Sequence, residues 1–363
     1  MNMNFFMPTK VIYGKGAVLK NREILRSLGE HFLVITGKSS MKNGSLDDVL
    51  EALEGKYVRI YDTTPENPPI ELIPEICSEF TDTTDIDVVI GLGGGSPMDT
   101  AKAVAVLLDN PQLNVRDLYD ATKYTSAKKI VCIPTTAGTG SEVTQFSVLT
   151  VDGRKMGFSN TKCTFPTIAF VDYSYTITMG RELTISTALD ALSHAMEGYI
   201  SLNATPLTDV LAMEAMKNIK EFLPRLLDDP ESEYYREKIM FASMLAGMVI
   251  AQTSTTVAHA LGYNLTTDKG IKHGLATAIF LPFELRNANT EKAETVKALF
   301  DGSLYRFYED IGIKLNIDIS DDDIEKWVKI VSTASHIRST PGNYDIDTLT
   351  EAFKEVRDMF CSE

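Results

Sequence analysis

The chain has 363 residues and a mass of 40.1 kDa, enough for about two domains at roughly 150 residues each. Its formal net charge of −15, from 35 Lys plus Arg against 50 Asp plus Glu, argues against a surface that binds nucleic acid or an anionic membrane. No apolar run approaches the roughly 20 residues of a membrane span, the N-terminus lacks a secretory signal pattern, and the four cysteines form no CxxC pair. We therefore expect a cytoplasmic protein with no membrane or nucleic-acid partner.

The first half of the chain alternates short β-branched runs with amphipathic segments, which is typical of a doubly wound parallel sheet. Strands are predicted at 32–36, 58–62, 88–92, 130–134 and 168–172, with helices beginning near Ser45, over 70–81 and up to Leu108. Beyond Arg181 helical periodicity dominates, and helices are predicted at 186–200, 208–222, 233–265 and in further segments ending near Met359. The sequence thus predicts an α/β domain over 1–180 and an all-helical domain over 181–363.

Two glycine-rich turns follow predicted strands. Gly94, Gly95 and Ser96 come after the third strand, and Thr135, Thr136 and Thr139 come after the fourth. Backbone N–H groups at a helix start and hydroxyls at the carboxyl ends of parallel strands are suited to bind phosphate. The pair of turns favours a nucleotide or phosphate site over plain connecting turns.

A third turn, Gly37, Lys38, Ser39 and Ser40, follows the first of these strands. It has no carboxylate of the kind that binds the ribose 2′-OH of NAD. A lysine with two hydroxyls suits a 2′-phosphate, while a turn with a solvated lysine is the equally simple alternative.

Three of the five histidines form a candidate metal site with one aspartate. Asp190 and His194 are four residues apart in a segment with helical periodicity, so both side chains project from one face. His259 and His273 also lie in apolar surroundings. One carboxylate and three imidazoles suit Fe(II) or Zn(II) and leave room for a substrate oxygen. The alternative is a set of core histidines bonded to backbone, and the two remaining histidines, His31 and His336, are predicted to be surface residues.

The stretches GGGSPMDTAKA, IPTTAGTGSEVT, STALDALSHAMEGYIS and AHALGYNLTTDKGIKHG, in this order, resemble the iron-containing (group III) alcohol dehydrogenases, above all the NADP-dependent, 1,3-propanediol dehydrogenase-like members. The resemblance covers nearly the whole chain. It implies a Rossmann-like dinucleotide-binding domain followed by a helical metal-binding domain, in a dehydroquinate synthase-like architecture with the active site in the cleft between them. It also implies a homodimer, which we expect to form through the N-terminal strand.

The resemblance further implies functional residues. Gly37 stands where NAD-preferring relatives carry an aspartate, which strengthens the expectation of NADP(H) over NAD(H). The implied metal ligands are Asp190, His194, His259 and His273, and the implied cofactor contacts are Gly94, Gly95, Ser96, Thr135, Thr136 and Lys155, with Asn67 and Asp99 in addition.

One position departs from the family pattern. Many relatives carry a second histidine four residues after the third metal ligand, where it is thought to relay a proton, and Tyr263 occupies that position here. A phenol, with an ordinary pKa of about 10, is a poor base at neutral pH. We therefore expect Tyr263 to form part of the pocket wall and not to act as a proton relay.

The expected activity is hydride transfer between NADP(H) and a short primary alcohol, diol or aldehyde. Enzymes of the glycerol dehydrogenase or dehydroquinate synthase kind are alternatives on the same fold, and a non-catalytic NADP-binding sensor is a third. The ligand stretches are apolar, and their nearest cations are Lys269 and Lys272. This favours a small neutral alcohol over a phosphorylated substrate.

Overall fold

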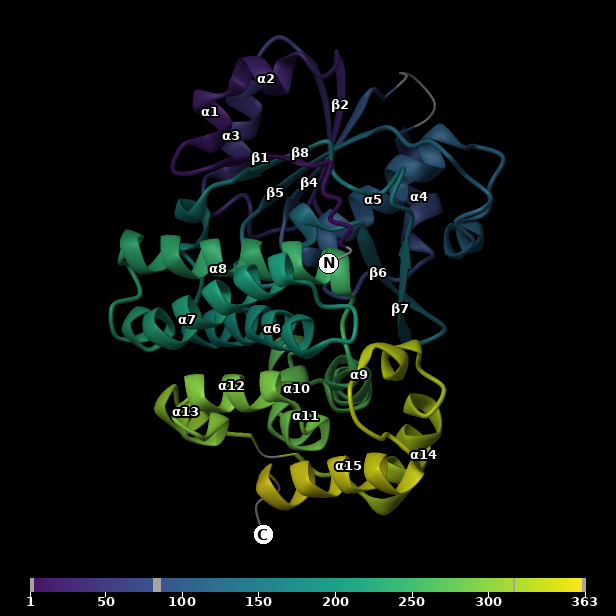
Figure 1. Ribbon diagram of the computed structural model, residues 1–363. Helices are drawn as coiled ribbons and strands as arrows, with labels where there is room; N and C mark the ends of the chain where they lie inside the picture. The colour runs from purple at the N-terminus through teal and green to yellow at the C-terminus, as the bar shows by residue number, and fades with distance from the viewer. Residues whose placement is uncertain (1–2, 81–85, 316, 361–363) are drawn as a thin grey trace. The chain divides into compact units, whose positions relative to one another are not determined.

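The computed structural model describes residues 3–80, 86–315 and 317–360, and its contacts divide the chain into two units (Figure 1). The sheet unit contains Phe6–Gly180 together with Glu231–Met240. The helical unit contains Arg181–Pro230 and the chain from Phe241 onward, with the first residues of the N-terminus. Residues 231–240 therefore belong with the sheet unit although they follow the predicted boundary. Thr81, the predicted end of one helix, and Cys361 lie outside the described residues.

The sheet unit is built on a six-stranded parallel sheet with the order β1-β8-β5-β4-β2-β3. The five predicted strands are all present, and β1 adds an edge strand. Their bounds are β1 (Lys10–Tyr13), β2 (His31–Thr36), β3 (Tyr57–Tyr61), β4 (Val88–Gly93), β5 (Lys129–Pro134) and β8 (Ile168–Val171).

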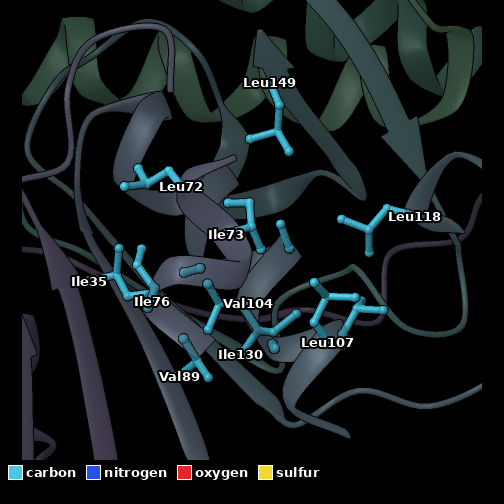
Figure 2. Packing of buried hydrophobic residues seen from close by; sticks show 14 of the residues in the cluster. Ile35, Leu72, Ile73, Ile76, Val89, Val104, Leu107, Leu118, Ile130 and Leu149 are labelled. Atoms are coloured by element: carbon cyan, nitrogen blue, oxygen red, sulfur yellow. The ribbon is translucent and has the colours of Figure 1, made fainter. Parts of the chain in front are cut away.

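Successive strand residues point to opposite faces, and both faces are covered by helices. Leu33 and Ile35 pack with α4 (Leu72–Phe80) and α5 (Gly95–Asp109), whereas Phe32 and Val34 pack with α1 (Ala17–Lys20) and α3 (Ser45–Ala52). Helix α2 (Arg22–Arg26) lies between α1 and α3 in the chain. Figure 2 shows the first cluster, where Val89 and Ile130 of the sheet lie near side chains of α4 and α5. Burial on both faces explains why the strands read as continuous apolar runs.

A β-hairpin outside the main sheet was absent from the sequence prediction. Strands β6 (Phe146–Val151) and β7 (Arg154–Ser159) pair antiparallel. They are joined by Asp152 and Gly153, whose φ values of 49° and 74° fit a two-residue turn with both central residues left-handed. An Asp-Gly pair is a hairpin signal, so this element was detectable from the sequence.

The helical unit contains the long buried helix α6 (Arg181–Ile200), which has polar as well as apolar residues among its buried positions. No single helix of the described residues is long and apolar enough to cross a membrane; α8 (Glu233–Thr253) and α9 (Val257–Lys269) pass that test only together, across a bend of 113°. The helices that follow the sheet are α6 (Arg181–Ile200), α7 (Pro206–Asp228), α8 (Glu233–Thr253), α9 (Val257–Lys269), α10 (His273–Ala278), α11 (Leu281–Ala288), α12 (Glu291–Leu299), α13 (Leu304–Asp310), α14 (Asp321–Val331) and α15 (Ile346–Phe360).

The predicted continuous helix over 233–265 was wrong, because the chain breaks between α8 and α9. Ser254 has a left-handed φ of 61°, and Thr256 begins α9 from an extended conformation. The N–H of Thr256 donates to the carboxylate of Glu197 on α6 instead of continuing the hydrogen bonds of α8. A tertiary contact thus overrides the apolar periodicity and redirects the chain before His259.

Candidate functional site

The four predicted metal ligands meet within the helical unit. Asp190 and His194 lie one turn apart on α6, His259 lies in the first turn of α9, and His273 begins α10. The Nε2 atoms of His194, His259 and His273 lie 3.8, 3.9 and 3.8 Å from one atom, Oδ1 of Asp190. Ligand atoms of Asp190, His259 and His273 all lie within 4.8 Å of one another.

These distances fit a shared cation better than hydrogen bonds. They exceed hydrogen-bond length, and Oδ1 of Asp190 is buried and accepts no hydrogen bond from any described residue. Ligands about 2.1 Å from one ion in tetrahedral arrangement are about 3.4 Å apart. A buried carboxylate oxygen faced by imidazole nitrogens at nearly this spacing matches the donor set of a divalent cation such as Fe(II) or Zn(II).

Two glycines allow the three helices of this site to approach closely. A Cβ at Gly274, on α10, would lie 2.0 Å from the carbonyl oxygen of Ser186 on α6. A Cβ at Gly262, on α9, would lie 2.8 Å from Cα of Thr277 on α10. Any larger residue at either position would separate helices that carry the metal-ligand candidates.

Glu197 fixes the orientation of His259. Its side chain is fully buried, and its Oε2 contacts Nδ1 of His259. Its Oε1 accepts hydrogen bonds from the backbone N–H groups of Thr256 and His259, at 3.2 and 3.0 Å. Burial alone would raise the pKa of this carboxyl, but its attraction to His259 and its hydrogen bonds with the side chains of His259 and Thr256 hold the pKa below the usual range. A carboxylate at Nδ1 keeps the proton there and leaves Nε2 free of hydrogen to face Asp190.

The site opens on one side. The side chain of His273 is 25% exposed, whereas those of His194 and His259 are 7% and 2% exposed. The ring of Tyr263 stacks on His273 with centroids 5.3 Å apart, so it lies beside the accessible ligand. Its place as a wall of the substrate pocket stays a prediction.

His336 is not the surface residue that the sequence predicted. Its ring lies 6.0 Å from that of Tyr263, centroid to centroid, and its Nδ1 is buried. Burial lowers the pKa of His336 to about 4, so the ring is neutral near pH 7. No local pattern indicates this burial, because the chain between α14 and α15 brings His336 to Tyr263 from more than 70 residues away.

In the sheet unit, the three predicted turns follow three neighbouring strands. Thr36 of β2 pairs with Leu92 of β4, and Gly93 of β4 pairs with Pro134 of β5, so the carboxyl ends of these strands lie together. The chain order reverses between β2 and β4, which is where open α/β sheets bind ligands. The first residue of the 15-residue helix α5 is Gly95, so the N-terminus of this helix, with its N–H groups, points to the same edge.

The two glycine-rich turns pack against each other. Cβ atoms at Gly94 and Gly95 would lie 3.3 and 2.9 Å from the side chains of Thr136 and Thr139. The N–H of Thr135 donates to the carbonyl of Gly93 at 2.9 Å. The structure therefore brings these predicted cofactor residues together in one surface.

Asn67 and Asp99 connect these turns to their surroundings. The N–H of Asn67 donates to Oγ of Ser96 at 3.3 Å. Asp99 is half-buried and accepts hydrogen bonds from Oγ of Ser141 at 2.7 Å and from the N–H of Val148 at 3.0 Å. These contacts use both oxygens of Asp99 to tie α5 to the second turn and to β6.

The remaining cofactor candidates differ in exposure. Lys38 and Ser39 are exposed, whereas Ser40 is buried and its hydroxyl donates to the carbonyl of Leu92 at 3.4 Å. Lys155 lies on β7, half-buried, in register with Thr150. The exposed face of the Gly37 turn thus consists of Lys38 and Ser39, whereas the buried Ser40 holds this turn against the end of β4.

Sequence reasoning missed Glu197, Thr256 and Glu284 beside the metal-ligand candidates. Glu197 follows Asp190 by seven residues and His194 by three, so helical periodicity places it on the same face and provided a signal. Thr256 and Glu284 had no such signal, since only the break before α9 brings them to Glu197.

Comparison with known proteins agrees with this geometry. The family "Iron-containing alcohol dehydrogenase" matches residues 8–173, and "Fe-containing alcohol dehydrogenase family, C-terminal" matches residues 184–356. A crystal structure of an iron-containing alcohol dehydrogenase from Thermotoga maritima is 46% identical, with a TM-score of 0.94 over 98% of this chain and 99% of that one.

Curated relatives include an NADPH-dependent butanol dehydrogenase from Clostridium saccharobutylicum, 32% identical over 78% of this chain and 74% of that protein. An NAD-dependent methanol dehydrogenase from Bacillus methanolicus is 32% identical over 77% of this chain and 74% of that protein. A parallel-sheet unit followed by a helical unit is thus the fold of these enzymes, and the matches extend over both units. The chain belongs to the iron-containing alcohol dehydrogenase family.

Proposed function

We propose that this family member interconverts a short primary alcohol or diol and its aldehyde, with NADP(H) as the hydride carrier and Fe(II) or Zn(II) in the helical unit. The observation that carries the proposal is the convergence of three imidazole Nε2 atoms on the buried Oδ1 of Asp190, at 3.8–3.9 Å. A divalent cation held there supplies Lewis-acid activation of the substrate oxygen.

The protein residues have separate roles in this proposal. Asp190 supplies the negative charge that offsets the cation, and His194, His259 and His273 supply neutral nitrogen ligands. Glu197 holds His259 in the required tautomer through Nδ1. The partly exposed edge at His273 and Tyr263 is where we place the substrate. Its aromatic neighbours, Tyr263 and His336, suit an uncharged alcohol.

The preference for NADP(H) rests on the turn after β2. Gly37 contributes no carboxylate to repel a 2′-phosphate, and Lys38 and Ser39 are exposed beside it. The pyrophosphate is assigned to the N–H groups of Gly94, Gly95 and Ser96 and to the hydroxyls of Thr135, Thr136 and Thr139. Because the whole chain is acidic, this local set of donors must provide the attraction for the cofactor phosphates.

The test combines a substrate panel with one ligand variant. Protein reconstituted anaerobically with Fe(II) or Zn(II) should oxidise short alcohols and diols faster with NADP than with NAD, followed by absorbance at 340 nm. His273→Ala should lose metal and turnover but bind NADPH with unchanged affinity, because His273 belongs to the helical unit and the glycine-rich turns belong to the sheet unit. Full turnover by metal-free His273→Ala protein would refute the proposal.

A homodimer through the N-terminal strand is also proposed. Strand β1 is an edge strand of the sheet, and among the described strands it pairs with β8 alone. Its other edge therefore has backbone groups able to pair with a second chain. Light scattering of the purified protein should give about twice the 40.1 kDa chain mass, and a monomer would contradict the assignment.

A further inference from the structure

The strongest unexplained feature of the helical unit is a second buried carboxyl, Glu284, close to the metal-ligand candidates. Glu284 lies in the first turn of α11 and is 0% exposed, as is Glu197. The two carboxyls share one neighbour, the hydroxyl of Thr256. Oγ1 of Thr256 lies 2.9 Å from Oε1 of Glu197 and 2.5 Å from Oε1 of Glu284.

The single hydroxyl hydrogen of Thr256 constrains the protonation of the Glu197 and Glu284 carboxyls. A hydroxyl has one proton and can donate one full hydrogen bond, yet two carboxyl oxygens contact it. One of the two contacts must therefore be a donation from a protonated carboxyl to Oγ1 of Thr256.

The other contacts of the carboxyls show which one holds the proton. Both oxygens of Glu197 face donors: two backbone N–H groups and the Thr256 hydroxyl at Oε1, and Nδ1 of His259 at Oε2. Among the described residues, the Glu284 carboxyl has one other hydrogen bond, from the N–H of Ala258, 3.3 Å from its Oε2. Its Oε1 is thus available to donate. Burial raises the pKa of Glu284 well above its usual value, and repulsion by Glu197 raises it further.

We propose that Glu284 is a positioning residue that stays protonated and donates a hydrogen bond to Oγ1 of Thr256. The hydroxyl hydrogen of Thr256 then points to Glu197. Glu197 in turn holds the ring of His259 in the orientation that metal binding needs. This hydrogen-bond chain runs from Glu284 to Thr256, then to Glu197, and ends at Nδ1 of His259. It rests on the proposed metal site and extends it by two residues that touch neither metal nor substrate. Its effect is on the tautomer and orientation of one ligand.

Two matched amide substitutions separate the roles of the carboxyls. In Glu284→Gln, the amide N–H replaces the acid O–H toward Thr256, and the amide oxygen still accepts from Ala258. In Glu197→Gln, an N–H group faces Nδ1 of His259 and forces that nitrogen to accept, which places the ring proton on Nε2. Glu284→Gln therefore preserves the hydrogen-bond chain, whereas Glu197→Gln breaks it at the metal-ligand candidate His259.

The experiment measures Zn²⁺ affinity by competition with a colorimetric chelator, together with thermal unfolding. We expect Glu284→Gln to bind Zn²⁺ within about twofold of the parent, and Glu197→Gln to bind it about 10- to 100-fold more weakly. Glu284→Ala removes the donor and should weaken binding about fivefold, the effect of one neutral hydrogen bond. The infrared difference spectrum, parent minus Glu284→Gln, should contain a buried carboxylic-acid carbonyl band, because the band of the second buried acid, Glu142, cancels between the two proteins.

The outcomes are distinguishable from failure of the metal site itself. If the parent binds no Zn²⁺, or binds it as well as His273→Ala does, the proposed metal site fails. If the parent binds Zn²⁺ and Glu284→Gln loses as much affinity as Glu197→Gln or does not fold, a charged Glu284 is required and the inference is overturned. Parental affinity in Glu284→Ala, or no carboxylic-acid band in the difference spectrum, overturns it as well.

Discussion

Replacing Gly274 by alanine should disrupt the candidate metal site without altering any of its ligands. The added Cβ would lie 2.0 Å from the carbonyl oxygen of Ser186 and 2.7 Å from Cβ of Asp190. Real Cβ atoms essentially never approach other atoms closer than 3.0 Å, so α10 must move from α6 by about 1 Å or more. The carbonyl belongs to the backbone of a helix and cannot rotate away as a flexible side chain could.

This displacement acts directly on two of the ligand candidates. His273 precedes Gly274 in α10, and Asp190 is one of the residues that the new Cβ would strike. Metal–ligand distances tolerate only about 0.2 Å, so a shift of about 1 Å removes at least one ligand. We expect Zn²⁺ affinity to fall by more than about 100-fold. Overpacking of this kind costs about 1–3 kcal/mol, which lowers the melting temperature by about 3–10 °C.

The assay is chelator competition for Zn²⁺ in parallel with thermal unfolding of metal-free protein. Gly157→Ala is the control, because a Cβ there is 3.8 Å from its nearest neighbour, an ordinary contact, and lies on β7 in the sheet unit. The control should match the parent in both measurements. If Gly274→Ala retained parental Zn²⁺ affinity and melting temperature, the close approach of α10 to α6 would not be what positions His273.

Two further substitutions test the sheet unit. Gly37→Asp is sterically allowed, since its Cβ would be 3.4 Å from the carbonyl of Thr64, and like-charge repulsion with a 2′-phosphate should lower kcat/KM for NADPH by about 100-fold or more while sparing NADH. Equal kinetics with both cofactors in that variant would contradict the NADP(H) assignment. Burial raises the pKa of Glu142 to about 7. The protonated side chain therefore contributes about 3 kcal/mol to the free energy of unfolding; this contribution is complete below about pH 4.5 and is lost as pH rises through 7. Glu142→Gln is neutral at every pH and should lack that decline in urea titrations between pH 5 and pH 9; parallel pH profiles of parent and variant would show that Glu142 is charged when folded.

Much of the sheet unit was predictable because its signals are local. Each parallel strand is buried on both faces and therefore reads as a short apolar run, and the turns that follow β2, β4 and β5 contain their own glycines and hydroxyls. The sequence also identified Asp190, His194, His259 and His273 as a set, because apolar segments rarely contain histidines without a reason. The Asp-Gly hairpin was within reach of the same local reasoning and was overlooked.

What the sequence by itself determined, then, is the type of the elements and the chemistry of the candidate ligands. Only the tertiary structure decided where the helix predicted over 233–265 breaks. The N–H of Thr256 donates to the carboxylate of Glu197, almost 60 residues earlier, and not to a carbonyl of the same helix. The same applies to Glu284, whose partner Thr256 is 28 residues away, and to His336, which reaches Tyr263 across more than 70 residues. These contacts depend on packing between helices, and no local pattern of residues encodes which helices will meet.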